Sequence, residues 1–165
     1  MKTRVLRRHQ VVSGEPDEVF AFFEDPMNLE TITPPWLHFA VVEASDAKVR
    51  LGTEIEYRLR WQIFPLRWRS RIAEHQAGVL FADEMLQGPY RRWYHRHLFT
   101  PVPGGVDMVD VVEYVLPFGP LGALAHATVV RRQLEAIFDY RREAVDALWP
   151  AGVPDRDLAT ATECR

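Results

Sequence analysis

The order in which the hydrophobic period changes along the chain constrains the fold more than any other feature. Short stretches of strand-like alternation, separated by turn signals, fill residues 36–116. After Gly119 and Pro120 the apolar residues recur at helical spacing until Trp149, and Pro150 ends the pattern. This order predicts an antiparallel meander followed by one amphipathic helix of roughly 30 residues.

A further strand and two short helices precede the meander. Residues 4–13 alternate loosely and predict a strand. Pro16 begins a short helix that runs to Phe23. Pro26 begins a second one, which must end before Pro34 because a proline cannot donate a helical hydrogen bond. The expected order is therefore strand, two short helices, six strands and a long helix.

The sheet and the helix must bury their apolar faces against each other. The meander strands are expected near 37–43, 53–62, 67–76, 79–86, 91–100 and 106–116. We therefore expect an α+β fold in which a curved, seven-stranded antiparallel sheet wraps around the long C-terminal helix. Residues 1–149 are expected to form one domain, and 150–165 a flexible tail.

The composition is that of a folded domain. Hydrophobic residues make up 47% of the chain, and its 20 basic side chains nearly balance its 23 acidic ones, so disordered and collagen-like classes are excluded.

The single cysteine, Cys164, cannot form an intramolecular disulfide, and no segment approaches the ~20 apolar residues of a membrane span. We expect a cytoplasmic protein without membrane insertion. Phosphate-binding glycine loops, a Gly-x-Ser-x-Gly elbow and a cysteine cluster are absent, so nucleotide-driven chemistry, serine hydrolysis and cysteine catalysis are not expected. No cofactor is expected.

Four local strings, taken with this element order, resemble the START-like superfamily, also called SRPBCC. They are Thr33-Pro34-Pro35-Trp36-Leu37, Gly88-Pro89-Tyr90 leading into Trp93-x-His95-x-His97-x-Phe99, Met108-x-Asp110-x-Val112-Glu113-Tyr114, and Leu116-Pro117-Phe118-Gly119-Pro120-Leu121-Gly122. The resemblance covers about residues 3–149 and points to a bacterial polyketide cyclase/dehydrase-like or ligand-binding branch. It implies the helix-grip fold of the pollen allergens. It leaves the function open, because lipid carriers, hormone receptors and cyclases share this fold.

Alternation places chemistry-bearing residues of two neighbouring strands on one face. On 91–100 this face carries aromatic and histidine side chains, and on 106–116 it carries apolar residues and one aspartate. A hairpin turn at Pro103 and Gly104 predicts the pairs Phe99–Met108, His97–Asp110, His95–Val112 and Trp93–Tyr114. Both aromatic faces then coincide, which supports this register.

The predicted inner wall is mostly apolar but carries titratable groups. Its expected ligand-binding residues are Tyr57, Trp61, Trp68, Phe81, Asp83, Met85, Trp93, Phe99, Met108, Tyr114, Val130, Leu134, Ile137 and Phe138. The candidate catalytic residues are His95, His97 and Asp110. Because an ordinary core would not bury so many titratable groups, we expect a wet or ligand-filled cavity, reached past residues 33–37.

His95 and His97 allow three interpretations, which the sequence leaves open. They could share a metal ion with Asp110 or Asp83. Asp110 could instead orient His97 for acid–base catalysis. In the third interpretation, which we adopt, His97 and Asp110 are a hydrogen-bonded pair that shapes a binding cavity, in direct or one-water contact. Accordingly, no metal site is expected.

Arginines cover the outer face of two strands, at Arg58, Arg60, Arg67, Arg69 and Arg71. A turn about residues 64–65 would place Arg60 opposite Arg69. It would also place Arg58 opposite Arg71, and such like-charge pairs are unfavourable unless acidic residues lie nearby. The neighbouring tryptophans point inward rather than beside the arginines, where they could stack on bases. We therefore expect a solvated or homodimer-forming face and no nucleic-acid partner, with RNA or ribosome binding as an alternative.

Two functions follow from the predicted cavity. The leading hypothesis is binding of a small hydrophobic or amphipathic ligand such as a lipid, an isoprenoid or quinone, or an aromatic polyketide. The alternative is a polyketide cyclase/dehydrase-like enzyme. In that enzyme His97 with Asp110, or His95, moves a proton while Tyr57 or Tyr114 polarises a carbonyl.

Overall fold

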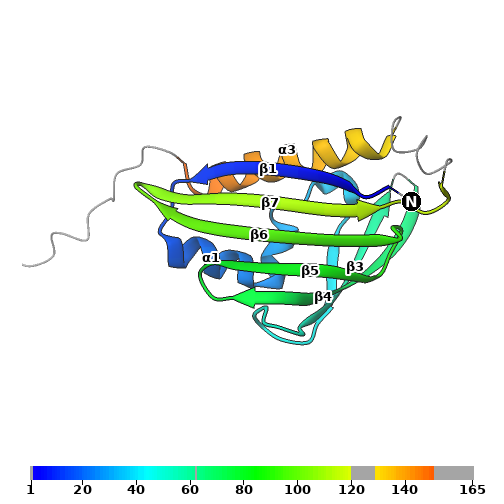
Figure 1. Ribbon diagram of the computed structural model, residues 1–165, viewed down its shortest axis with the longest axis horizontal. Helices are drawn as coiled ribbons and strands as arrows, with labels where there is room; N and C mark the ends of the chain where they lie inside the picture. The colour runs from blue at the N-terminus through cyan, green and yellow to red at the C-terminus, as the bar shows by residue number, and fades with distance from the viewer. Residues whose placement is uncertain (1, 62, 120–128, 151–165) are drawn as a thin grey trace, which may run out of the picture.

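A curved antiparallel sheet wraps around one long helix in the computed structural model, which describes residues 2–61, 63–119 and 129–150 (Figure 1). The seven strands have the spatial order β1-β7-β6-β5-β4-β3-β2. Strands β2 to β7 form the expected meander, and β1 pairs with β7 at its far edge. This confirms the predicted α+β helix-grip architecture.

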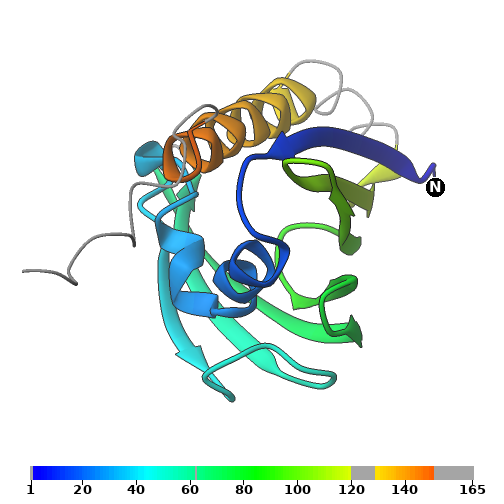
Figure 2. The ribbon, with the colours of Figure 1, turned by 90° about the vertical axis from the view of Figure 1, so that its left-hand side faces the viewer.

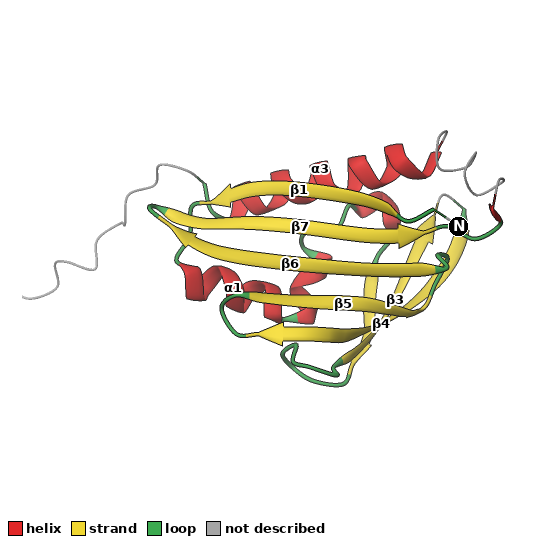
Figure 3. Ribbon diagram, viewed as in Figure 1, coloured by secondary structure: helices red, strands yellow, loops and turns green. Residues whose placement is uncertain are grey.

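The order of the elements is the predicted one with one addition, because a third short helix, η2, precedes β2. Figure 3 colours the helices and strands. Their bounds are β1 Arg4–Val12, α1 Pro16–Glu24, η1 Pro26–Glu30, η2 Pro35–Leu37, β2 Ala40–Ala44, β3 Glu54–Trp61, β4 Phe64–Gln76, β5 Leu80–Gln87, β6 Arg92–Val102, β7 Gly105–Val115 and α3 Arg131–Leu148. The short elements η1 and η2 are 3-10 helices. A proline begins α1, η1 and η2, because its missing N–H has no helical partner at that position anyway.

Helix α3 crosses the open side of the curved sheet (Figure 2). It buries Leu134, Phe138 and Val145, which the four- and seven-residue spacings place on one face. The sequence predicts a helix of roughly 30 residues from its apolar spacing. Residues 120–128 of that prediction, and the predicted tail beyond Pro150, lie outside the described residues. Neither α3 nor any other described helix is long and apolar enough to cross a membrane.

Gln10 ties the edge strand β1 to the C-terminal half of α3. Its side-chain amide donates to the backbone carbonyl of Arg142 at 3.0 Å and to Asp146 Oδ1 at 2.7 Å. Gln10 is buried, so these bonds satisfy an amide that would otherwise be costly to desolvate. They hold the helix across the concave face of the sheet.

The β6–β7 hairpin has the register that the sequence predicts. It turns at Pro103 and Gly104, and its partners include Phe99–Met108, His97–Asp110, His95–Val112 and Trp93–Tyr114. The next residue, Gly105, lies against β1, where a Cβ atom would stand only 2.0 Å from the carbonyl oxygen of Val12. A glycine is therefore required where the turn enters β7 beside the end of β1.

The predicted β3–β4 register is wrong by four residues. Arg60 lies opposite Pro65 rather than Arg69, and Arg58 lies opposite Arg67 rather than Arg71. The chain turns before Phe64, so Pro65 belongs to β4. Pro65 is tolerated there because β5 pairs only with residues 69–76 of β4, which leaves one side of this end unpaired.

The observed register places acidic residues among the outer arginines. Glu56 lies opposite Arg69 and Glu54 opposite Arg71. Arg69 forms an ion pair with Glu54 at 3.2 Å, and Arg71 forms one with Glu84 on β5. The five outer arginines are exposed, as predicted, and the like-charge contacts are fewer than the predicted turn implied.

Candidate functional site

A cavity of about 690 Å³ lies between α3, the inner face of the sheet and the segment from α1 to η2. This volume falls within the range of ~300–1,000 Å³ that small-molecule sites occupy. Left dry, such a space would cost roughly 17 kcal/mol at ~24 cal/mol per Å³, more than the ~5–15 kcal/mol that stabilises a whole domain. The cavity must therefore hold water or a ligand.

Ten of the predicted ligand-binding residues line this cavity, together with the candidate catalytic residues His95 and His97. The ten are Tyr57, Trp61, Trp68, Phe81, Asp83, Trp93, Val130, Leu134, Ile137 and Phe138. They come from β3, β4, β5, β6 and the helical end of the chain, which the sheet curvature brings around one space (Figure 2).

The other four predicted ligand-binding residues are not in the described lining. Phe99 and Met108 are buried beneath α1, which covers that end of β6 and β7. The ring of Phe20 on α1 lies 5.1 Å from that of Phe99. Tyr114 is buried beside its cross-strand partner Trp93, at 6.1 Å between ring centroids. Met85 is half-buried near the end of β5 and also lies outside the lining.

Several lining residues were not predicted, and Arg141 on α3 is the most consequential. Its side chain is only 12% exposed, and its guanidinium carbon lies 5.4 Å from the ring centre of Phe138. The sequence signal was available, because residue 141 follows Phe138 by three and therefore shares its helix face. The other unpredicted polar residue on α3 is Gln133, whose Oε1 accepts a hydrogen bond from Trp61 Nε1.

Asp110 of β7 is the centre of a buried charged cluster behind the cavity wall. Its Oδ1 accepts a hydrogen bond from His95 Nε2 at 2.8 Å. His97 Nδ1 is also 2.8 Å from Oδ1, which confirms the predicted direct contact, although its direction does not meet hydrogen-bond geometry. Arg141 Nη1 lies 3.8 Å from the same oxygen. The two histidines and the arginine thus share one carboxylate.

The surroundings of the two carboxyl groups, Asp110 and Asp83, shift their pKa values in opposite directions. Burial alone would raise the pKa of Asp110, but its contacts with His95 and His97 hold that pKa well below the usual value. Burial, together with the nearby His97, lowers the pKa of His95 to about 3. At neutral pH Asp110 is therefore a carboxylate and His95 a neutral imidazole. Because the carboxylate only accepts, the proton of His95 resides on Nε2.

Asp83 of β5 faces the cavity on the other side of His95. Its Oδ2 lies 3.8 Å from His95 Nδ1, and the hydroxyl of Ser70 lies 3.4 Å from Oδ1. Ser70 in turn accepts a hydrogen bond from Trp68 Nε1 at 2.9 Å. Burial raises the pKa of Asp83 to about 6, because neither contact is short enough to stabilise the charge fully.

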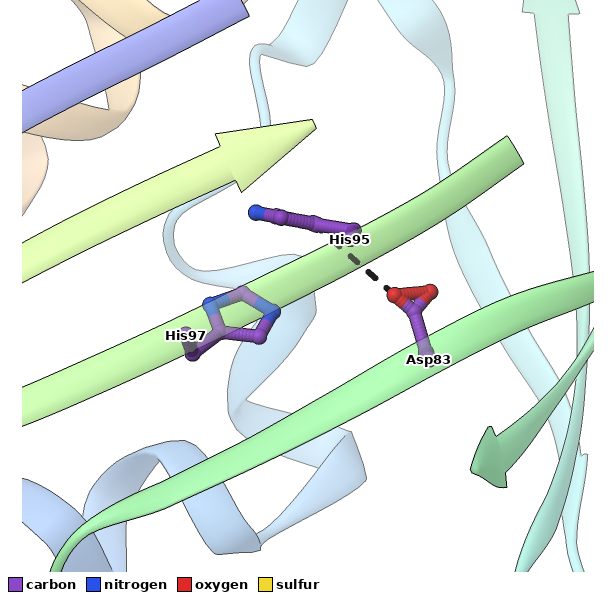
Figure 4. A group of neighbouring side chains, drawn as sticks. All are labelled: Asp83, His95 and His97. Atoms are coloured by element: carbon purple, nitrogen blue, oxygen red, sulfur yellow. Dashed lines mark ion pairs between the residues drawn. The ribbon is translucent and has the colours of Figure 1, made fainter. Parts of the chain in front are cut away.

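Figure 4 shows the cavity side of this cluster. The Asp83 carboxylate points from β5 toward β6, and the rings of His95 and His97 stand side by side on β6 with centroids 3.9 Å apart. Phe81 stacks on His97 at 4.5 Å. These polar groups therefore form one cluster on a wall that is mostly apolar.

Two exposed phenylalanines line the cavity outside the segment 33–37, past which the sequence predicts access. Phe64, at the β3–β4 turn, and Phe118, after β7, both line it and are 56% and 77% exposed. In the segment 33–37, by contrast, the lining residues Thr33 and Leu37 are half-buried and buried. In the segment itself Trp36 is 50% exposed, and access past residues 33–37 stays a prediction.

The same architecture occurs in known structures. Protein TTHA0849 from Thermus thermophilus is 18% identical, with a TM-score of 0.63 over 88% of this chain and 99% of that one. The Zhui aromatase/cyclase from Streptomyces sp. R1128 is 15% identical, with a TM-score of 0.65 over 92% and 99%. A point mutant of norcoclaurine synthase from Thalictrum flavum is 14% identical, with a TM-score of 0.63 over 89% and 96%.

Neither a family model nor a curated protein matches the chain by sequence. The structural neighbours have the helix-grip fold of the START-like (SRPBCC) superfamily. This chain has the same fold, which confirms the architecture that the sequence resemblance implied. At these identities the likeness establishes the fold alone.

Proposed function

We propose that this protein binds one small hydrophobic or amphipathic molecule in the cavity between α3 and the sheet. The observation that carries the proposal is the combination of a 690 Å³ space, a largely apolar wall and a largely buried polar cluster of Asp83, His95 and Arg141 on that wall. An apolar ligand body would displace water from the wall, and a polar end would meet Asp83, His95 and Arg141.

An aromatic ligand body fits this wall best. Trp68, Tyr90 and Trp93 form a cluster with ring centroids 4.9–5.7 Å apart, two of the three pairs being edge-to-face. All three residues line the cavity, so a ligand ring can extend their packing. Aromatic polyketides and quinones are therefore favoured over fatty acyl chains.

Titration with the fluorescent probe 1-anilinonaphthalene-8-sulfonate tests this proposal. Ile137 lines the cavity and Ala136, the preceding residue on α3, is exposed. We expect saturable binding of one probe per chain, weakened at least about tenfold, or 1.4 kcal/mol, by Ile137→Trp because the larger ring fills the cavity. Ala136→Trp is the matched control and should bind like the wild type. Equal affinity in both variants would place the probe elsewhere.

A second candidate function is acid–base catalysis on a carbonyl compound. The observation that favours it is the chain of groups from Asp110 through His95 to Asp83, with contacts of 2.8 and 3.8 Å. Such a chain can take a proton from a bound ketone and return it. Of the two tyrosines considered for polarising a carbonyl, Tyr57 lines the cavity and Tyr114 does not.

Proton exchange on a bound ketone separates the two candidates. In D₂O, an enzyme of this kind should accelerate deuterium incorporation next to the carbonyl of α-tetralone, measured by NMR. His95→Gln should abolish the acceleration while tetralone affinity is retained. A binding protein without catalysis shows tetralone affinity and no acceleration, and this outcome would exclude the second candidate for this class of ketone.

A further inference from the structure

Asp83, His95 and His97 bring three possible metal ligands to one point on the cavity wall (Figure 4). One donor atom from each residue lies within 4.8 Å of the other two. Strand geometry produces this cluster, because Asp83 is the direct partner of His95 and His97 follows on the same face. Two imidazoles and one carboxylate are a donor set suited to divalent first-row transition metals.

Asp110 sits behind both imidazoles and determines which nitrogen each of them presents. Its Oδ1 is 2.8 Å from His95 Nε2 and 2.8 Å from His97 Nδ1. A carboxylate can only accept, so the hydrogen bond from His95 places its ring proton on Nε2. His97 Nδ1 lies equally close without hydrogen-bond geometry, and the negative charge beside it favours a proton on that nitrogen. The lone pairs are then on His95 Nδ1 and His97 Nε2. A carboxylate that orients an imidazole from behind is the usual outer contact of metal-ligating histidines.

The Asp83 carboxylate lacks a short partner among the described residues. Its contacts with Ser70 and His95 are 3.4 and 3.8 Å long, and its side chain is 16% exposed, within the cavity lining. Asp83 and Asp110 together carry more negative charge than Arg141 alone offsets. A cation beside Asp83 would therefore supply what the protein side chains leave unsatisfied.

We propose that Asp83, His95 and His97 bind one divalent first-row transition-metal ion, through His95 Nδ1, His97 Nε2 and an Asp83 oxygen. Ligand bonds of about 2.1 Å place neighbouring donors roughly 3.0–3.5 Å apart in tetrahedral or octahedral geometry. Donors that lie up to 4.8 Å apart must therefore close by up to about 1.3–1.8 Å, through rotation of the Asp83 side chain and of the imidazole rings. The remaining coordination positions face the cavity, where an oxygen atom of the cavity ligand can occupy them.

Metal titration of the full chain tests the site. Cys164 is replaced by serine throughout, so that its thiol cannot contribute, and the protein is first treated with a chelator. Calorimetry with Zn²⁺ and the visible absorption of added Co²⁺ report binding and coordination. The variants are Asp83→Asn and His97→Gln, and the matched control is His9→Gln, because His9 also contacts an aspartate but is exposed on β1.

We expect one ion per chain and, in the two ligand variants, an affinity loss exceeding the ~10–100-fold that even outer contacts cause. The His9→Gln control should bind like the unmodified site. Absence of binding up to about 0.1 mM Zn²⁺, or equal affinity in Asp83→Asn and His9→Gln, would overturn the proposal. Probe binding measured in chelator is independent of the ion, so the proposed ligand-binding function can survive this failure.

Discussion

The buried pair of Asp110 and Arg141 offers the sharpest test of how the cavity wall is held together. Asp110 and Arg141 have side chains only 5% and 12% exposed, and their closest charged atoms are 3.8 Å apart. At the effective dielectric constant of ~20 that suits such sites, this separation corresponds to about 4 kcal/mol of attraction. Removing one partner leaves the other charge buried with less compensation, from His95 and His97 for Asp110 and from Asp83 for Arg141. Breaking a buried pair typically costs about 3–5 kcal/mol, and these remaining contacts place the expected loss in the lower part of that range.

A double-mutant cycle measures this coupling. Asp110→Asn and Arg141→Gln should each lower the free energy of unfolding by about 3–4 kcal/mol, and the double variant should lose several kcal/mol less than the sum. Urea denaturation followed by tryptophan fluorescence, with a chelator present, gives these values.

The exposed pair of Arg8 and Asp139 is the matched control for this cycle. Its charged atoms are 3.4 Å apart, and its side chains are 33% and 68% exposed, so the coupling should be at most about 1 kcal/mol. Additive effects of Asp110→Asn and Arg141→Gln, within about 0.5 kcal/mol, would refute the view that Arg141 balances the buried carboxylate.

Four further substitutions test the fold around the site by the same denaturation assay. Gly105→Ala should lower the free energy of unfolding by more than about 2 kcal/mol, because its Cβ would collide with the Val12 carbonyl oxygen. Gly104→Ala, with φ +81° but open space around it, should lower it by about 1 kcal/mol. Equal losses in the two variants would contradict the close approach of Gly105 to Val12. Gln10→Leu should cost about 1–3 kcal/mol and speed amide exchange in the C-terminal half of α3, since it removes the two bonds to that helix; unchanged exchange would contradict this tether. Arg71→Gln removes an exposed ion pair with a β5 glutamate and should cost less than about 1 kcal/mol; a larger loss would mean that the outer face contributes more than its exposure suggests.

The two hairpins show how far alternation can predict a sheet. In β6–β7 two signals predicted the same register, namely the turn residues Pro103 and Gly104 and the matching aromatic faces. The structure has this register. In β3–β4 the predicted and observed registers differ by four residues. A slip by an even number keeps every side chain on its own face, so the hydrophobic pattern cannot distinguish the two. Only the position of the turn separates them.

The cavity depends on packing between elements that are distant in the sequence. Strand alternation placed His95, His97 and Asp110 on one face, and the structure brings them together. Strand alternation could not show that α1 covers Phe99 and Met108, because that contact depends on how the first helix returns to the sheet. The sequence pattern also did not predict the contact between Arg141 and Asp110, although the helical spacing places Arg141 on the correct face of α3. The pattern of residues within one helix or strand does not specify which other element it packs against.

Methyl NMR of the protein with an added aromatic ligand tests the central claim most directly. Ile55, Ile72 and Leu134 line the cavity from three different elements, whereas Val5 and Val11 are exposed on β1. Titration with 1-anilinonaphthalene-8-sulfonate should shift the three cavity methyl signals along one saturable curve and leave the two exposed valines unchanged. Shifts confined to the exposed valines, or spread evenly over both sets, would contradict binding between α3 and the sheet.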